Sequence, residues 1–225
     1  MEIKVGVAHT GSERCGATRT RLPQRRYAAT AVGVAAFGPL VTAAIDRLDG
    51  FAPCEQTLVG DGADWIWRLG RDLLPEATPV LDRWHLRDAR RRATRAAIAD
   101  KELRAPWSAQ LEAALDGGAV DDALAVLAEM GQQYPHRAVD EFAVGRPLSS
   151  MHNQRGRIVD YAARRAAGRT IGSGVVEKGA DVVVNRRLHG KRGMRWRRDR
   201  ADAVVALRLA RLNDEWETRL AACAA

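Results

Sequence analysis

The sequence predicts an α/β protein in which a small mixed sheet with helices is interrupted by an all-helical insertion. Short alternating or apolar runs, typical of strands, are confined to the first 86 residues. From residue 87 to about residue 167, apolar residues recur at helical spacing without a strand signal. Helical stretches also close the chain, so the predicted divisions are 1–86, 87–168 and 169–225.

Strand and helix signals alternate in the first division. Ile3, Val5 and Val7 alternate with polar residues, which is typical of a half-buried strand. Short apolar runs end at Asp61 and Asp82, and the segments between them carry helical spacing. The predicted strands are 2–8, 26–34, 56–59 and 79–81, and the predicted helices are 37–48 and 64–73.

The rest of the chain shows helical signals only. The Gly-Gly pair at 117–118 and Gly131 mark helix ends. The predicted helices of the insertion are 87–101, 107–115, 121–130, 137–144 and 155–167, and those of the last division are 178–188 and 201–220.

The charge balance favours a polyanionic partner. The 225 residues include 36 Lys and Arg against 28 Asp and Glu, with a formal net charge of +8 and a pI of about 10.1. Arginine dominates the bases, and its guanidinium forms paired hydrogen bonds with phosphate. This balance fits nucleic acid or an acidic membrane surface. A genome rich in arginine codons is the alternative explanation for the arginine content.

Several features predict a cytoplasmic protein associated with the nucleoid. No apolar run approaches the roughly 20 residues of a membrane span, and the first residues lack the apolar core of a signal peptide. Cys15, Cys54 and Cys223 are odd in number and lack metal-ligand spacing, as expected of reduced thiols. We therefore expect no membrane partner.

Two carboxylates lie in settings that suit metal chemistry. Asp61 follows the apolar run 57–59 in a Gly-Asp-Gly turn, so it should project from the tip of a strand. Glu177 follows the Gly-Ser-Gly turn at 172–174 and opens an apolar, helix-like stretch. Brought together by the fold, these carboxylates would suit a divalent ion such as Mg²⁺, which prefers oxygen ligands.

Asp82 and His85 form a further candidate pair at the end of the predicted strand 79–81. A carboxylate and an imidazole three residues apart can lie on one side of a strand-to-helix turn. An Asp or His at a strand end is more often a cap or a loop hydrogen bond. The position of Asp82 strengthens the functional interpretation of this pair. Asp61 and Asp82 both follow apolar strand runs, so they lie at one sheet edge if their strands are parallel neighbours.

Four motifs occur in an order that resembles a known family. They are Gly-Asp-Gly-Ala-x-Trp-Ile at 60–66, Leu-Asp-x-x-His at 81–85, Gly-Ser-Gly-Val-Val-Glu at 172–177 and Arg-Gly-Met-Arg-Trp at 192–196. Together they resemble the DDE transposases of bacterial insertion sequences, in the ISKra-like and ISLre-like groups, which are relatives of the Mutator-type transposases. The resemblance extends from about residue 1 to residue 216.

The resemblance implies an RNase H-like fold with a helical insertion before the last acidic residue. It implies that Asp61 is the second catalytic Asp and Glu177 the catalytic Glu, and that both are metal ligands. It also implies that Asp82 and His85 support the active centre without being among its three carboxylates. The implied cofactor is Mg²⁺ in a two-metal arrangement, and the implied reaction is DNA cleavage and strand transfer.

The chain departs from the family pattern near its beginning. In the family the first catalytic Asp lies on the first strand of the sheet, upstream of a segment like 1–7, whereas no Asp precedes Asp46 here. Glu2 is the only nearby carboxylate and lies on the wrong strand. We therefore expect a C-terminal fragment without the first strand of the sheet, which binds Mg²⁺ weakly and cleaves little or no DNA.

Basic residues are concentrated between residues 186 and 200, with His189 and Trp196 among them. Basic clusters that include an aromatic residue can follow a phosphate backbone, although solvated arginines and a Trp196 packed on the core are the alternative. The predicted helix 87–101 is a second, weaker basic candidate. The predicted DNA-binding residues are Arg186, Arg187, Lys191, Arg192, Arg195, Arg197 and Arg198.

Three functions are compatible with these features. The first is a truncated catalytic domain of a DDE transposase, with element ends and target DNA as partners and intact transposase as a homo-oligomeric partner. The second is a non-enzymatic DNA-binding remnant that interferes with intact transposase. The third is a basic helical nucleic-acid-binding module unrelated to transposases, and the ordered motifs disfavour it.

Overall fold

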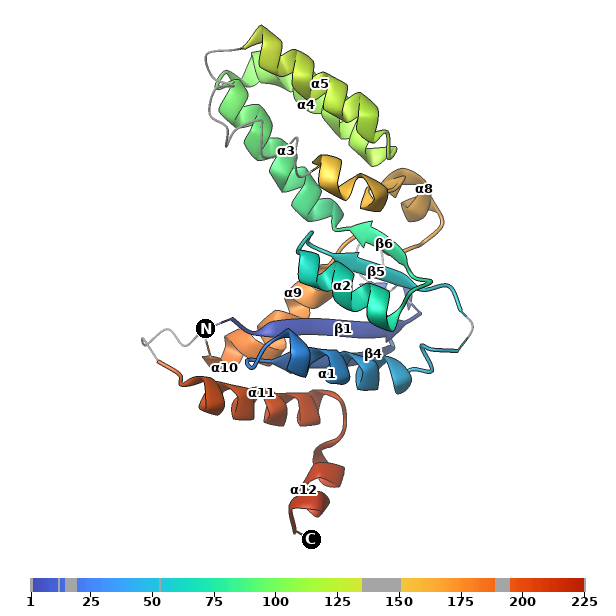
Figure 1. Cartoon of the computed structure of the whole chain (residues 1–225), viewed down its shortest axis with the longest axis vertical. Helices are drawn as coiled ribbons and strands as arrows, with labels where there is room; N and C mark the ends of the chain where they lie inside the picture. Colours follow the sequence, from blue (N-terminus) through green and yellow to red (C-terminus); the bar gives the residue numbers. More distant parts are fainter. Residues whose placement is uncertain are drawn as a thin grey trace. The chain divides into compact units, whose positions relative to one another are not determined.

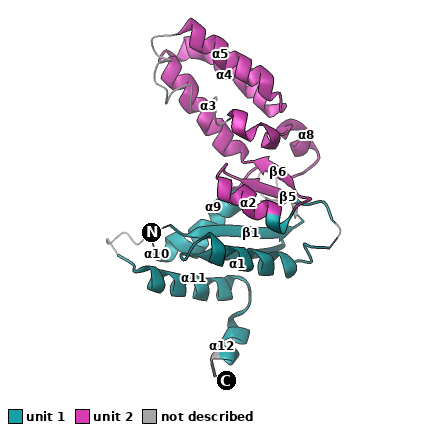
Figure 2. Cartoon of the chain, viewed as in Figure 1, with its two compact units in different colours: residues 1–56, 72–74, 174–225 teal, residues 57–71, 75–173 magenta. Residues whose placement is uncertain are grey.

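The computed structural model describes residues 2–11, 13–14, 20–52, 54–134, 151–188 and 195–224. The chain divides into two compact units, each assembled from separate stretches of sequence (Figure 2). Unit 1 comprises Met1–Gln56, Asp72–Leu74 and Gly174–Ala225, and unit 2 comprises Thr57–Arg71 and Pro75–Ser173.

Unit 1 is built on an antiparallel ladder of two strands (Figure 1). In this ladder Val7 lies opposite Tyr27 and Val5 lies opposite Ala29. The strands of unit 1 are β1 (Lys4–Thr10), β2 (Glu13–Arg14), β3 (Thr20–Arg21) and β4 (Gln24–Thr30), where β1 pairs with β4 and β2 with β3. Its helices are α1 (Val34–Asp46), α9 (Gly174–Ala180), the π-helical turn η2 (Asp181–Asn185), α10 (Arg186–Leu188), α11 (Arg198–Leu212) and α12 (Trp216–Ala224).

Helices cover both faces of the β1–β4 ladder. Successive side chains of a strand point to opposite faces, so Gly6 and Val7 face different helices. A Cβ atom at Gly6 would lie 3.0 Å from the Phe37 ring of α1, which shows how closely that helix approaches. On the other face, Tyr27 belongs to a core cluster with Val183 of η2 and residues of α11, and Val7 packs against this cluster.

Unit 2 joins a parallel strand pair to a set of helices. Its strands are β5 (Thr57–Gly60) and β6 (Thr78–Leu81), and its helices are α2 (Asp64–Leu73), α3 (Arg83–Ala97), α4 (Lys101–Asp116), α5 (Val120–Gln133), the short 3-10 helix η1 (Arg155–Arg157) and α8 (Tyr161–Ala166). Helices α4 and α5 lie side by side (Figure 1). Leu111, Leu127, Met130 and Tyr161 are fully buried in the core of this unit.

The predicted α/β class is confirmed, and helices account for most of the described residues. The predicted helix 64–73 is confirmed at both ends. The strands form separate two-stranded ladders in the described part of the chain, whereas the sequence predicted one mixed sheet. The predicted helix 137–144 lies outside the described residues, and the three sequence divisions stay a prediction.

Two predicted helices are interrupted in the structure. The predicted helix 155–167 is divided into η1 and α8, because Asp160 accepts a hydrogen bond from the N–H of Ala163 at 2.7 Å and starts α8 anew. The predicted helix 201–220 ends at Leu212. There the side chain of Asn213 bonds both the N–H and the carbonyl of Tyr27, at 2.8 Å and 2.9 Å. A contact 186 residues away in sequence therefore ends this helix.

Candidate functional site

The carboxyl ends of β5 and β6 bring two predicted site residues to one sheet edge. The strands are parallel, with Gly60 opposite Leu81, and the N–H of Asp82 donates to the carbonyl of Gly60 at 2.7 Å. Asp61 and Asp82 each follow the last residue of their strand. The prediction that both carboxylates lie at the same edge is therefore confirmed.

Asp61 lies in an exposed turn between β5 and α2. One of its carboxylate oxygens, Oδ1, accepts a hydrogen bond from the N–H of Ala63 at 3.0 Å. Gly62 has a φ of 102°, a conformation that favours glycine. Within the described residues the second oxygen of Asp61 accepts no hydrogen bond, so one face of this carboxylate is open to a ligand.

Asp82 is buried, with 1% of its surface exposed, and both of its oxygens accept hydrogen bonds. Oδ1 accepts from the N–H of His85 at 2.9 Å, which makes Asp82 the N-cap of α3. Oδ2 accepts from the N–H of Ser173, 91 residues away in sequence. The capping role that was the alternative for Asp82 is thus confirmed, and Asp82 also ties two of the motifs together.

The pKa of Asp82 lies below its usual value. Burial alone would raise this pKa, because it disfavours the charged form. The hydrogen bonds from Ser173 and His85 stabilise the carboxylate and outweigh burial. Asp82 is therefore an anion at neutral pH, and its negative charge lies 3.3 Å from Nδ1 of His85.

The His85 ring is held on one side and open on the other. Its Nδ1 faces the buried Asp82 carboxylate, while 45% of the side chain is exposed. Such a carboxylate favours one orientation of the ring. Ser173 contributes through its backbone N–H, directly before α9 begins at Gly174.

Tyr161 is a site-supporting residue that no sequence motif indicated. Its side chain is fully buried, and its hydroxyl donates to the carbonyl of Leu81, next to Asp82, at 2.8 Å. Burial first and the charge of Asp82 second raise the pKa of this hydroxyl, so it stays protonated and keeps donating. In the sequence Tyr161 is a single tyrosine within the predicted helix 155–167, and no residue spacing indicates that it contacts Leu81.

We expect Tyr161→Phe to lower the free energy of unfolding by about 1–1.5 kcal/mol, the typical value of one hydrogen bond. Urea denaturation followed by circular dichroism measures this change. Tyr134→Phe is the matched control, since Tyr134 is half-buried and packs edge-on against Trp107. Equal effects of the two variants would contradict the importance of the Leu81 contact.

Glu177 belongs to unit 1, whereas Asp61, Asp82 and His85 belong to unit 2. It lies exposed in the first turn of α9, a helix that packs against β1. A Cβ atom at Gly179 would lie 2.9 Å from Val7, so the glycine allows this close approach. The π-helical turn η2 follows α9, and such turns occur frequently at functional sites.

The predicted DNA-binding residues differ in their surroundings. Lys191 and Arg192 lie outside the described residues. Two of the others are ion-paired, Arg186 with Asp181 at 3.1 Å and Arg197 with Asp199 at 3.4 Å. The remaining ones, Arg187, Arg195 and Arg198, are exposed and appear in none of these ion pairs. They are the better candidates for contact with phosphate.

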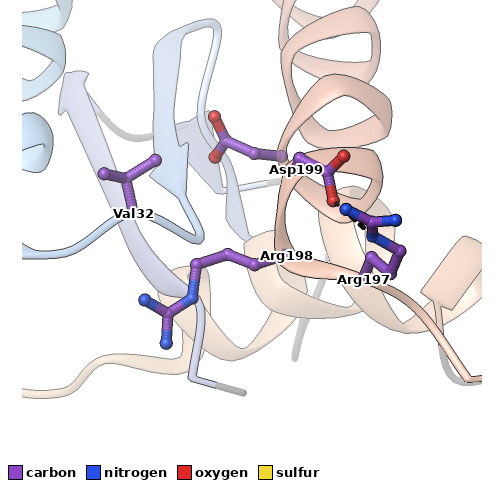
Figure 3. A pocket seen from close by; sticks show the side chains of 5 residues that line it. Val32, Arg197, Arg198 and Asp199 are labelled. Carbon is purple, nitrogen blue, oxygen red and sulfur yellow. Dashed lines mark ion pairs between the residues drawn. The ribbon is translucent and has the colours of Figure 1, made fainter.

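Two of these arginines line surface hollows of unit 1. Arg198 lines a hollow of about 690 Å³ with Val32, Arg197, Asp199 and Asp202. In Figure 3, Arg197 turns toward Asp199 while Arg198 points away from that pair. Arg187 lines a second hollow of about 450 Å³, whose wall includes Arg208, Arg211, Trp216 and Leu207.

The basic helix α3 is only partly available to a partner. Arg90 is buried, donates to the carbonyl of Ser108 at 2.5 Å and pairs with Glu112 at 3.2 Å. Its inclusion in a DNA-binding surface was wrong, because packing against α4 removes it from solvent. Trp67 is buried in the core of unit 2. Trp196 packs against the core cluster of unit 1, which confirms the alternative given for this residue.

The described residues do not assemble a complete metal site. No group of three His, Cys, Asp or Glu side chains suited to a metal occurs among them. Both oxygens of Asp82 already accept N–H groups, and this residue is 1% exposed. Glu2 is exposed, lies before β1 and pairs with Lys4. At the β5–β6 edge the described residues supply the open carboxylate of Asp61, and the binding of Mg²⁺ stays a prediction.

Comparison with known proteins gave no match to a family model, a curated protein or a solved structure. In the part of the chain that the structure describes, no helix is both long and apolar enough to cross a membrane.

Proposed function

We propose that this chain is part of the catalytic domain of a DDE transposase with an RNase H-like fold, acting on DNA. One observation carries the proposal: Asp82 joins three of the four motifs, the first through its N–H, which donates to the carbonyl of Gly60, and the other two through its buried carboxylate. It follows β6 beside Asp61 and accepts hydrogen bonds from His85 and Ser173. Segments separated by up to 91 residues thus meet at Asp82, and this contact supports the proposal.

In this proposal Asp61 and Glu177 are the catalytic carboxylates and the ligands of Mg²⁺, which in the family supports cleavage and strand transfer. Asp82 and His85 support them. The contacts of the Asp82 carboxylate with His85 and with the N–H of Ser173 support this assignment. Since the described residues form no group of three ligands, we expect slow DNA nicking by this chain.

Nicking of a supercoiled plasmid that carries the ends of the element, in the presence of Mg²⁺, tests the proposal. We expect Asp61→Ala and Glu177→Ala each to reduce the slow nicking to background while DNA binding is retained. Asp64→Ala and Glu217→Ala are matched controls, because both side chains are exposed carboxylates in the first turn of a helix. Nicking that survives either catalytic substitution would reject that residue's role.

A second candidate function is a non-enzymatic DNA-binding domain that interferes with intact transposase. The absence of a three-ligand group among the described residues and the exposure of Arg187, Arg195 and Arg198 favour it. Complete lack of nicking together with salt-sensitive DNA binding would select this function. Lack of both nicking and DNA binding would reject both candidates.

A further inference from the structure

Gln154 lies in a hydrogen-bond chain that ends at the proposed catalytic carboxylate Asp61. Its side chain is 7% exposed, and Nε2 donates to the carbonyl of Gly62 at 3.0 Å. The peptide unit that carries this carbonyl also carries the N–H of Ala63. That N–H donates to Asp61 Oδ1 at 3.0 Å. A single peptide group therefore connects Gln154 to Asp61.

Arg157 determines which way the Gln154 amide faces. Its Nη1 donates to Gln154 Oε1 at 2.9 Å and to the carbonyl of Asn153 at 3.2 Å. Because a guanidinium only donates hydrogen bonds, the amide oxygen must face Arg157 and the amide NH₂ must face Gly62. The side chain of Gln154 is thus oriented as a donor to the turn.

The same arginine contacts the helix that follows the turn. The guanidinium carbon of Arg157 lies 4.9 Å from the centre of the Trp67 ring, a distance typical of cation–π contact. Trp67 is 3% exposed within α2, the helix that begins three residues after Asp61. Gln154 therefore contacts the turn at Asp61, and Arg157 contacts both Gln154 and the helix that follows the turn.

We infer that Gln154 is a positioning residue: together with Arg157 it fixes the Gly62–Ala63 peptide, and this peptide orients the Asp61 carboxylate. The turn is exposed and contains a glycine at a φ of 102°, so its own covalent structure restrains the peptide plane weakly. Catalytic side chains need such support from the groups around them. The chemical importance of Asp61 rests on the proposed function, whereas the clamp itself does not.

Nuclear magnetic resonance on the full chain tests this inference through amide exchange at Ala63 and the carboxyl carbon shift of Asp61. Gln154→Glu keeps an acceptor for Arg157 but has no N–H for Gly62, and Gln154→Ala loses both contacts. We expect both variants to exchange the Ala63 N–H at least about tenfold faster and to shift the Asp61 carboxyl signal. Arg155→Ala, a neighbour in η1 whose exposed side chain pairs with Asp121, should change neither.

Protection of the Leu111 amide in the core of unit 2 separates local loosening from unfolding, and it should be unchanged in Gln154→Glu. Unchanged Ala63 exchange and an unchanged Asp61 signal in both Gln154 variants would overturn the inference. Neither signal depends on catalysis. A failed nicking assay would therefore contradict the proposed function but not the positioning role of Gln154. An intact Ala63 contact in the variants would contradict the positioning role but not the proposed function.

Discussion

Asp82→Ala is expected to lower the free energy of unfolding by about 3 kcal/mol. The loss of an N-cap typically costs about 1 kcal/mol, and a buried N–H left without a partner costs about 1–3 kcal/mol. Both effects contribute here, because Asp82 caps α3 and accepts from the part-buried N–H of Ser173. Urea denaturation at pH 7 measures the effect.

The effect of Asp82→Ala should depend on pH. The pKa of Asp82 is lowered in the folded chain, so its carboxylate contributes its full stability above the unfolded value of about 3.9. This contribution is lost as the pH falls through the lower folded value. The difference between wild type and variant should be constant from about pH 7 to 5 and should shrink below about pH 4.

Asp100→Ala is the matched control, since Asp100 caps α4 but is exposed. Its effect should be smaller than that of Asp82→Ala, because water replaces the lost acceptor. Asp82→Asn retains one acceptor oxygen and should be intermediate at pH 7. An Asp82→Ala cost no larger than that of Asp100→Ala would show that the contact with Ser173 adds nothing.

Replacing Arg187, Arg195 and Arg198 together by glutamine is expected to weaken DNA binding at least about tenfold at physiological salt. Each arginine that contacts a phosphate contributes about one to the slope of log K against log salt. The slope should therefore fall by about two to three. Fluorescence anisotropy of a labelled duplex over a series of salt concentrations measures both quantities.

A matched triple of Arg91, Arg92 and Arg95 on α3 removes the same charge from another exposed surface. This triple should leave the salt slope nearly unchanged, because α3 corresponds to the predicted helix 87–101, the weaker of the two candidates for DNA contact. A larger fall in slope for the α3 triple would move the DNA interface from unit 1 to α3. Equal and small changes in both triples would remove both surfaces from the interface.

Local patterns in the sequence were sufficient for the elements around Asp61 and Asp82. Short apolar runs followed by turn residues predicted β5 and β6, and the structure places both aspartates at the same end of this parallel pair. Helix α2 was predicted with the correct bounds, since its apolar spacing and Pro75 are local signals. The α/β class followed from the same two periodicities.

Contacts between distant residues account for what the sequence analysis missed. Gln154 bonds Gly62 over 92 residues and Tyr161 bonds Leu81 over 80 residues, and neither lies in a motif with diagnostic spacing. Asn213 ends α11 through Tyr27, which no helix-end signal in the sequence indicated. Charge counts likewise did not distinguish the buried Arg90 from its exposed neighbours.

The sequence by itself determined the α/β class, the strand ends that carry Asp61 and Asp82, and the basic character of the segment after Glu177. These properties depend on periodicity, turn chemistry and composition within a few residues. Only the tertiary structure decided that Asp82 is a buried anion, that Gln154 reaches the Asp61 turn and which arginines are ion-paired. Burial and hydrogen bonding depend on which distant segments pack together, and local sequence patterns do not encode that choice directly.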